Sequence, residues 1–374
     1  MPAAKPSTGP CPQWWHATQA FLVPGLIVSL IFLAMGQQLV GSILLSLNLG
    51  FLGWVLYHRC GLLSSITVKK GVSFNLRNMD ENLHGRLYQT RCLTNLNTLI
   101  NTYNKGPRIV EKGGVRVILR AFILYSDNEK DSGGEHVGNV EITELALQAM
   151  FGLLRTSPKE SATQILQKWT IKHVAGYLDE LNHDDLDMDE KVRNKLIVLV
   201  LKIIAQLSEH TTPEARGSNG WSNTLVTSVL HCMKARLRDQ TEAESMQQWG
   251  ICCLYNIQHN VNVSKESFSN CGGFNVVLDA VRRHRQALKL NQLAAVLMAE
   301  CVFESVSKHA TALKFLPEVF AEALSSGVMS ALQDMGKEFP NNGDIHNCKR
   351  LMASEYSKPR PEVDVDRVEF VEMN

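Results

Sequence analysis

The feature that most constrains the fold of this chain is a short motif that recurs along its length. Five segments suit the first turn of a helix, and they follow one another at intervals of about 50 to 56 residues. They are Gly113-Gly114-Val115, Trp169-Thr170-Ile171, Gly220-Trp221, Gly272-Gly273-Phe274 and Gly327-Val328. Longer apolar stretches of helical period alternate with them, at residues 86–103, 142–155, 191–208, 243–258 and 290–306. Each unit is therefore predicted to contain a short, a medium and a long helix.

Units of this kind fold only in a stack, because one unit cannot bury its apolar faces alone. Apolar residues such as Leu196 and Leu199 follow the helical spacing, and no alternating apolar and polar run is long enough to predict a strand. The sequence thus predicts an all-α helical solenoid over residues 86–355. Within it, we expect Trp249 and Leu254 to contact neighbouring units.

Two helix starts and two long helices resemble the armadillo-repeat family. The family opens a repeat with Gly-Gly and an apolar stretch, as in EKGGVRVIL (residues 111–119) and CGGFNVVL (residues 271–278). Its third helix carries a late Asn, as in RCLTNL (residues 91–96) and CCLYNI (residues 252–257). The resemblance covers about 270 residues and implies a right-handed armadillo/HEAT-like solenoid.

The same resemblance implies a binding groove. In the family, such an Asn lines the concave face and holds the backbone of an extended peptide by its amide, which both donates and accepts hydrogen bonds. This implies Asn95 and Asn256 as partner-binding residues, and Gln206 stands at the corresponding place of another long helix. The alternative interpretation is that these side chains are polar helix residues that face water.

The densest basic cluster consists of Arg282, Arg283 and Arg285, with Lys289 nearby. One interpretation is a patch that binds anionic lipid headgroups or an acidic partner peptide. The other is an ordinary solvated helix surface.

The N-terminal part of the chain differs from the rest in its charge. Between Lys5 and Arg59 there is no Asp, Glu, Lys or Arg, and residues 18–57 are mostly apolar. One helix of that length would extend about 60 Å, roughly twice the core of a bilayer. We therefore predict a hairpin of two transmembrane helices, 18–35 and 39–57, over the alternatives of one tilted span or a re-entrant loop.

The flanks of the hairpin predict its orientation. Trp14 and Trp15 precede the first span, Trp54 and Tyr57 close the second, and four basic residues follow before the first acid of the chain. Interfacial aromatics and positive charge at the outer ends place both ends, and the solenoid, on the cytosolic side of a membrane. The predicted division is a membrane segment at 1–60, a basic linker at 61–85, the repeat domain at 86–355 and a disordered tail at 356–374.

The overall composition is that of a globular protein. The chain has 374 residues, 45% hydrophobic and 20% charged, and 38 basic against 37 acidic side chains give a net charge of +1. This balance argues against a nucleic-acid partner, because phosphate contacts require an excess of Lys and Arg. It also argues against intrinsic disorder of the whole chain.

Motifs of catalysis and metal binding are missing from the sequence. The nine cysteines form no Cys-x-x-Cys pair, which favours buried free thiols, and no His-x-x-x-His signals zinc. Asp185-x-Asp187-x-Asp189 begins like a calcium loop, but the sixth position is Glu190 instead of Gly and the twelfth is Leu196 instead of Glu. We predict no catalytic residue, no metal and no cofactor.

Three functions follow as hypotheses. The first is a non-enzymatic scaffold, anchored on the cytosolic membrane face, that recruits a partner protein or an extended peptide through its groove. The second is membrane shaping or lipid handling, in which residues 18–57 contact membrane lipids and are the active element. The third, an enzyme with dispersed catalytic residues, has no motif in its support.

Overall fold

The computed structural model describes residues 62–126, 139–183, 188–218, 221–236, 243–303 and 316–356. Within these ranges the chain forms helices and no strand, so the predicted all-α class is confirmed. The chain divides into two compact units, Met1–Phe74 and Asn75–Asn374. Of the first unit, only the N-terminal part of α3 (Leu62–Glu81) is described. The second unit contains the other described helices.

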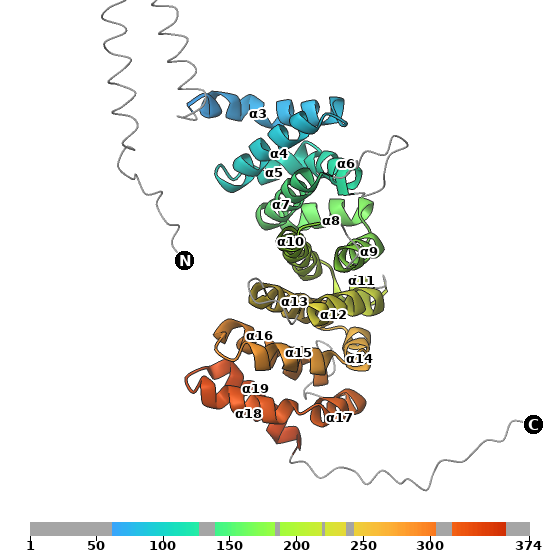
Figure 1. The fold of residues 1–374 in the computed structure, drawn as a ribbon, viewed down its shortest axis with the longest axis vertical. Coiled ribbons are helices and arrows are strands. Elements are labelled where there is room, and N and C mark those ends of the chain that lie inside the picture. The colour runs from blue at the N-terminus through green and yellow to red at the C-terminus, as the bar shows by residue number, and fades with distance from the viewer. Residues whose placement is uncertain are drawn as a thin grey trace, which may run out of the picture. The chain divides into compact units, whose positions relative to one another are not determined.

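Long and shorter helices alternate along the second unit (Figure 1). The long helices are α4 (Arg86–Asn101), α7 (Val140–Thr156), α10 (Glu190–Glu209), α13 (Ala243–Gln258), α16 (Leu288–Val302) and α19 (Gly343–Tyr356). The shorter ones are α5 (Gly106–Glu111), α6 (Gly114–Ser126), α8 (Pro158–Lys168), α9 (Ile171–Asn182), α11 (Pro213–Ser218), the π-helical turn η1 (Trp221–Leu225), α12 (Val226–Ala235), α14 (Asn262–Asn270), α15 (Gly273–Arg283), α17 (Pro317–Ser325) and α18 (Val328–Glu338).

These helices lie where the sequence predicts them. The five predicted long helices coincide with α4, α7, α10, α13 and α16, and the five predicted starts coincide with the starts of α6, α9, η1, α15 and α18. Units of short, medium and long helix follow one another from α5 to α19. The chain is thus all-helical, with many packed helices in an order that is compatible with a helical repeat fold.

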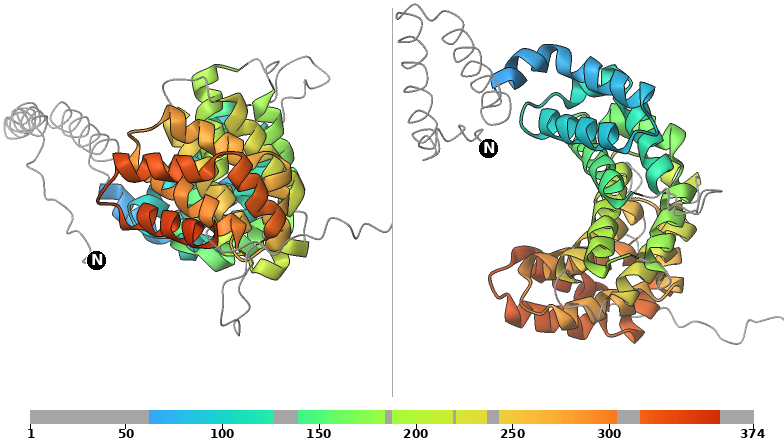
Figure 2. Two further views of the ribbon diagram at one scale, coloured as in Figure 1. Left: turned by 90° about the horizontal axis from the view of Figure 1, so that it is seen from below. Right: turned by 45° about the horizontal axis from the view of Figure 1, so that its top comes forward.

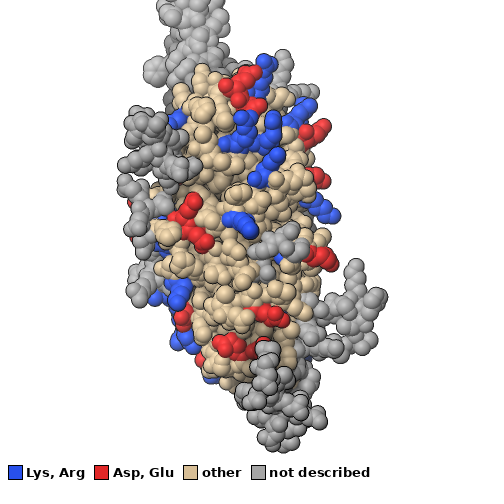
Figure 3. Space-filling model, turned by 90° about the vertical axis from the view of Figure 1, so that its right-hand side faces the viewer, with Lys and Arg blue, Asp and Glu red and all other residues tan. Residues whose placement is uncertain are grey.

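The helices pack in two layers. Each long helix contacts the next one along the chain, and α6, α9, α12, α15 and α18 each contact the long helix of their own unit. Figure 1 shows the long helices on the left of the second unit and several of the shorter ones, such as α6, α9, α12, α14 and α17, on the right. Figure 2 shows this stack bent, with the long helices on its inner side. The face of the shorter helices carries scattered side chains of both charges (Figure 3).

The Gly-Gly starts have a steric cause. Gly113 and Gly272 adopt left-handed backbone conformations, with φ of 75° and 71°, which a residue with a side chain rarely adopts. The second glycine of each pair packs closely on the preceding short helix: a Cβ on Gly273 would lie 2.3 Å from a ring carbon of Phe268. The first glycine therefore allows the turn, and the second allows the two helices to approach.

The core lies between the two layers. Leu254 is fully buried, as expected, whereas Trp249 contacts neighbouring units at the surface and is only half-buried. In the outer layer, Phe122 of α6 packs edge-to-face on Trp169 and Tyr177, with ring centroids 4.9 and 5.1 Å apart, and so joins two units. The core is thus continuous from unit to unit.

The predicted fold class needs a correction, because it placed a transmembrane hairpin before the solenoid. None of the described helices is long and apolar enough to cross a membrane. The two longest, α3 and α10, each carry at least five charged residues in their sequences. The spans predicted at 18–35 and 39–57 lie outside the described residues, and the location predicted from them stays a prediction.

Two of the predicted segment boundaries can be compared with the structure. Helix α3 occupies most of the stretch that was predicted as a basic linker, residues 61–85. Residues 357–374, most of the predicted disordered tail, lie outside the described residues.

Candidate binding surface on the long helices

Each long helix leaves one stripe of side chains uncovered. On α13, the half-buried or exposed positions include Ser245, Trp249, Cys252 and Tyr255, which are three or four residues apart, and His259 continues this spacing just after the helix ends. That spacing defines one face of a helix. Because the other faces of α13 pack on α10, α12 and α16, this stripe forms part of the inner side of the stack.

Two aromatic rings and two cations gather on this inner side. They are Phe151 and Arg155 of α7, Lys202 of α10 and Trp249 of α13, and we refer to them as the inner-face cluster. The Lys202 ammonium lies 5.8 Å from the centroid of the Phe151 ring and 5.4 Å from that of Trp249, and the Arg155 guanidinium lies 5.9 Å from the Phe151 ring. All three distances fall within the range of cation–π attraction, about 6 Å.

The rings of the cluster lie close together although their helices are not adjacent. Helix α10 separates α7 from α13, and two helix spacings amount to about 16–20 Å. Nevertheless, the ring centroids of Phe151 and Trp249 are only 6.4 Å apart, in an edge-to-face arrangement. The two rings therefore lean toward each other over Lys202, as expected on the concave side of a bent stack.

The cations of the cluster have no anionic partner among the described residues. Two turns away on α10, by contrast, Lys195 forms an ion pair of 2.7 Å with Glu144 of α7. Burial lowers the pKa of the Lys202 ammonium below its ordinary value, since the rings and the helix exclude part of its water. The cluster thus presents positive charge that an incoming anion would neutralise.

The three amides predicted from the sequence all lie on long helices, and each has an intramolecular partner. Asn95 Nδ2 donates to Asn75 Oδ1 at 3.2 Å, Gln206 Nε2 to Glu209 Oε2 at 3.0 Å, and Asn256 Nδ2 to the carbonyl of Ala205 at 2.9 Å. The Asn256 bond joins α13 to the preceding long helix. Gln206 follows Lys202 by four residues and Asn256 follows Trp249 by seven, so helical spacing places both beside the inner-face cluster.

The structure separates the basic cluster from these amides. Arg282 forms an exposed ion pair of 3.0 Å with Asp279, and Arg283 and Arg285 are exposed at the end of α15. The end of α15 leads into the N-terminus of α16. Asn256 lies near the other end of α16, because His259, three residues after Asn256, is 3.5 Å from Glu300 near the C-terminus of α16. The 15 residues of α16 span about 22 Å, so the two groups occupy opposite ends of the stack's width.

Phe151, Arg155 and Lys202 were not among the residues proposed from the sequence. The signal that could have indicated them is their register: an aromatic, a basic and an aromatic residue occupy the uncovered stripes of three consecutive long helices. Sequence alone does not show this register, because it depends on which stripe the outer layer leaves free.

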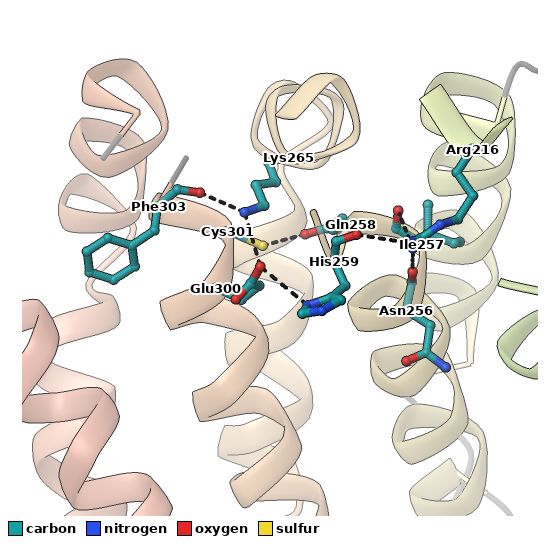
Figure 4. A network of polar contacts seen from close by, with 9 residues as sticks. All are labelled: Arg216, Asn256, Ile257, Gln258, His259, Lys265, Glu300, Cys301 and Phe303. Carbon is teal, nitrogen blue, oxygen red and sulfur yellow. Dashed lines mark hydrogen bonds and ion pairs between the residues drawn. The ribbon is translucent and has the colours of Figure 1, made fainter. Parts of the chain in front are cut away.

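Two buried cations cap the C-termini of long helices (Figure 4). Arg216 of α11, only 4% exposed, donates to the carbonyls of Asn256, Ile257 and His259 at the end of α13. Lys265 of α14 is fully buried; its ammonium donates to the carbonyl of Phe303 at 2.6 Å and lies 3.2 Å from Glu300. The carbonyls at a helix C-terminus lack intrahelical partners and carry partial negative charge, so both cations have a structural role.

No family model matches the chain, and no curated protein matches it either. Among solved structures, it is similar to the crystal structure of an engineered protein from the Northeast Structural Genomics Consortium, with a TM-score of 0.53, at 14% identity, over 76% of this chain and 95% of that one. This likeness shows the fold alone.

The outer layer contains an open polar cavity of about 530 Å³. It is lined by Asp179, Asn182, His183, Asn223, Thr224, Thr227, Ser228 and His231. Ser228 donates to Asp179 at 2.9 Å, and Asn182 lies within hydrogen-bond distance of His231, so the serine hydroxyl is not paired with an imidazole base. Within the described ranges, no group of three or more His, Cys, Asp or Glu side chains could hold a metal ion.

Proposed function

We propose that this chain is a non-enzymatic, armadillo-like scaffold whose inner face binds an extended, acidic segment of a partner protein. The observation that carries the proposal is the inner-face cluster, in which two cations lie against two aromatic rings without a carboxylate partner among the described residues. Aromatic and arginine side chains contribute most of the binding energy in many protein interfaces.

The chemistry of the cluster favours carboxylates flanked by apolar side chains. A carboxylate beside Lys202 or Arg155 would form a charge-assisted hydrogen bond, which is stronger than a neutral one. The faces of Phe151 and Trp249 would cover apolar side chains at the same time. The partner segment is extended because the cluster crosses three helices, and about five or six extended residues span two helix spacings.

The armadillo-like assignment is supported by the order of the helices and by the Gly-Gly starts. In this proposal, Gln206 and Asn256 flank the bound segment. The hydrogen bond from Asn256 to Ala205 orients the amide, and its Oδ1 is the atom that accepts from a backbone N–H of the segment.

The test is the binding of synthetic peptides in which Glu or Asp alternates with Val, measured by fluorescence anisotropy. We expect Trp249→Ala to weaken binding about tenfold or more, as removal of a central aromatic residue does in other interfaces. Lys202→Gln should weaken it and reduce its dependence on salt. Peptides with Lys in place of the acids should not bind.

The matched control is Arg282→Ala, which removes an exposed cation at the opposite end of the stack's width and should leave affinity unchanged. If Arg282→Ala weakens binding while Lys202→Gln has no effect, the basic cluster at Arg282, Arg283 and Arg285 is the binding surface and the proposal is wrong.

A further inference from the structure

The C-terminal segment of this chain has the chemistry that the inner-face cluster would recognise. Residues 361–374, PEVDVDRVEFVEMN, contain five acids and one basic residue. Glu362, Asp364 and Asp366 alternate with Val363 and Val365. In an extended chain successive side chains point to opposite faces, so this stretch would present carboxylates on one face and valines on the other.

The spacing of an extended chain fits the spacing of the cluster. Side chains two residues apart on one face are separated by about 6.7 Å. The ring centroids of Phe151 and Trp249 are 6.4 Å apart, and the Lys202 ammonium is within 6 Å of both. Because the valines and the carboxylates lie on opposite faces of an extended segment, only one of these faces can contact the cluster. The acidic face would bring successive carboxylates, about 6.7 Å apart, beside Lys202 and Arg155, and it is the face that would neutralise their charge.

The segment is also long enough to reach the cluster from its own chain. The last described residue, Tyr356, ends α19, and residues 357–374 follow it outside the described residues. Asp364 and Asp366 follow Tyr356 by eight and ten residues, which extend up to about 29 and 36 Å. Three helix spacings, from α19 through α16 and α13 to α10, amount to about 24–30 Å.

We infer that residues 361–374 bind the inner-face cluster of their own chain and so compete with partner segments for it. The inference rests on the proposed function and names one occupant of the same surface. A tethered segment has an effective concentration in the millimolar range. A segment that binds with a Kd of about 100 µM as a free peptide would then occupy its own site most of the time, and would weaken a competitor about tenfold.

The first experiment uses the full chain and a fluorescent synthetic peptide of residues 359–374. In a variant with Asp364→Lys and Asp366→Lys, the tail should leave the cluster, and the added peptide should bind about tenfold more tightly than it binds the wild-type chain. Adding Lys202→Glu to that variant should abolish the gain. Lys358→Ala, outside the alternating stretch, is the matched control and should bind the peptide as the wild-type chain does.

The outcomes separate the two proposals. One outcome is that the peptide binds the wild-type chain and the charge-reversed variant equally well, and that Lys202→Glu abolishes binding to each of them. The inner face would then bind acidic peptides without being occupied by the tail, and the inference would be wrong. If alternating acidic peptides of other sequence bind and the 359–374 peptide does not, the inference again fails alone. If none binds any variant, both proposals fail.

A second experiment locates the tail directly. A photoreactive benzoylphenylalanine in place of Phe370 of the full chain should cross-link to α7, α10 or α13, with a yield that is independent of protein concentration. Cross-links to the outer helices would overturn the inference. Cross-links between two molecules that increase with concentration would also overturn it, since they would show binding to a second copy.

Discussion

Lysine and arginine side chains have two different roles in this protein, and their surroundings separate them. Lys265 and Arg216 are buried, and each donates to carbonyls at the end of a long helix. Lys202 is half-buried against two rings and pairs with no described carboxylate. A buried cation without polar partners would be costly, so the first pair is expected to stabilise the fold and Lys202 to bind an anion.

Glycine substitutions should have opposite effects at two helical positions. Gly273→Ala should lower the free energy of unfolding by about 1–3 kcal/mol, because the new Cβ would overlap the Phe268 ring. Gly176→Ala should raise it by about 0.5–1 kcal/mol, because Gly176 lies inside α9 with no atom near the position of a Cβ, and alanine favours helix. Urea unfolding followed by circular dichroism measures both, and equal effects would contradict the close packing at Gly273.

The buried thiols predict a loss of stability at alkaline pH. Burial raises the pKa of Cys232 to about 12 and that of Cys348 to about 11, above the ordinary value of 9.0. In the unfolded chain these thiols ionise near pH 9, whereas the folded protein keeps them neutral. Their contribution is therefore complete below pH 9 and falls by about 1.4 kcal/mol per pH unit for each thiol as the pH rises toward its folded pKa. Urea midpoints at pH 7.5 and 10 measure the loss, and Cys232→Ala should reduce it.

The C-termini of α13 and α16 are capped by side chains from other helices. Arg216 and Lys265 both lie in the short first helix of a unit, and each donates to the C-terminus of the long helix in the same unit. Each short helix thus positions the end of its long helix. Both cations thus lie on helical segments, 213–218 and 262–270, that begin their units.

Removal of the Lys265 cap should be costly. Lys265→Met keeps the length of the side chain but leaves the Phe303 carbonyl without its donor and Glu300 without its cation. We expect a loss of about 2–4 kcal/mol in the free energy of unfolding. Lys337→Met, which removes an exposed ion pair with Asp334, is the matched control and should cost less than about 0.5 kcal/mol. Similar losses for both variants would show that Lys265 does not cap α16.

At the scale of the molecule, the second unit is a stack in which long helices contact their sequential neighbours. Stability in such a stack comes from each unit and from its contacts with the next. Helix α13 has a long helix on each side, whereas α19 is the last described long helix and contacts only α16 among them. Units in the middle should therefore be more strongly coupled than those near the end.

Matched core substitutions should reveal this coupling. Leu254 of α13 and Leu332 of α18 are both fully buried, and replacement of either by Ala should cost about 2–5 kcal/mol. Hydrogen exchange should show the difference: Leu254→Ala is expected to speed exchange in α10 and α16, and Leu332→Ala only from α16 onward. Identical exchange patterns would mean that the stack unfolds as one cooperative unit.

Much of the architecture follows from the sequence alone. The helical spacing of apolar residues predicted where the long helices lie. Glycine pairs such as Gly113-Gly114 marked the starts of two medium helices, because a left-handed backbone and close helix packing require residues without a side chain. The all-α class and the order of helices within a unit were predictable for these local reasons. The transmembrane hairpin of the predicted fold class was not upheld, since none of the described helices is long and apolar enough to span a membrane.

The proposed binding surface depends on tertiary structure. From the sequence, Trp249 is expected to lie in the core. The packing of α12 and α16 on other faces of α13 leaves it half-exposed on the inner face. Asn256 was predictable as a polar residue near a helix end, but its hydrogen bond to Ala205 comes from a helix about 50 residues away in the chain. Phe151, Lys202 and Trp249 meet because the stack bends around α10. Sequence periodicity determines which faces of a helix are apolar, but the curvature of the stack determines which of the remaining side chains converge.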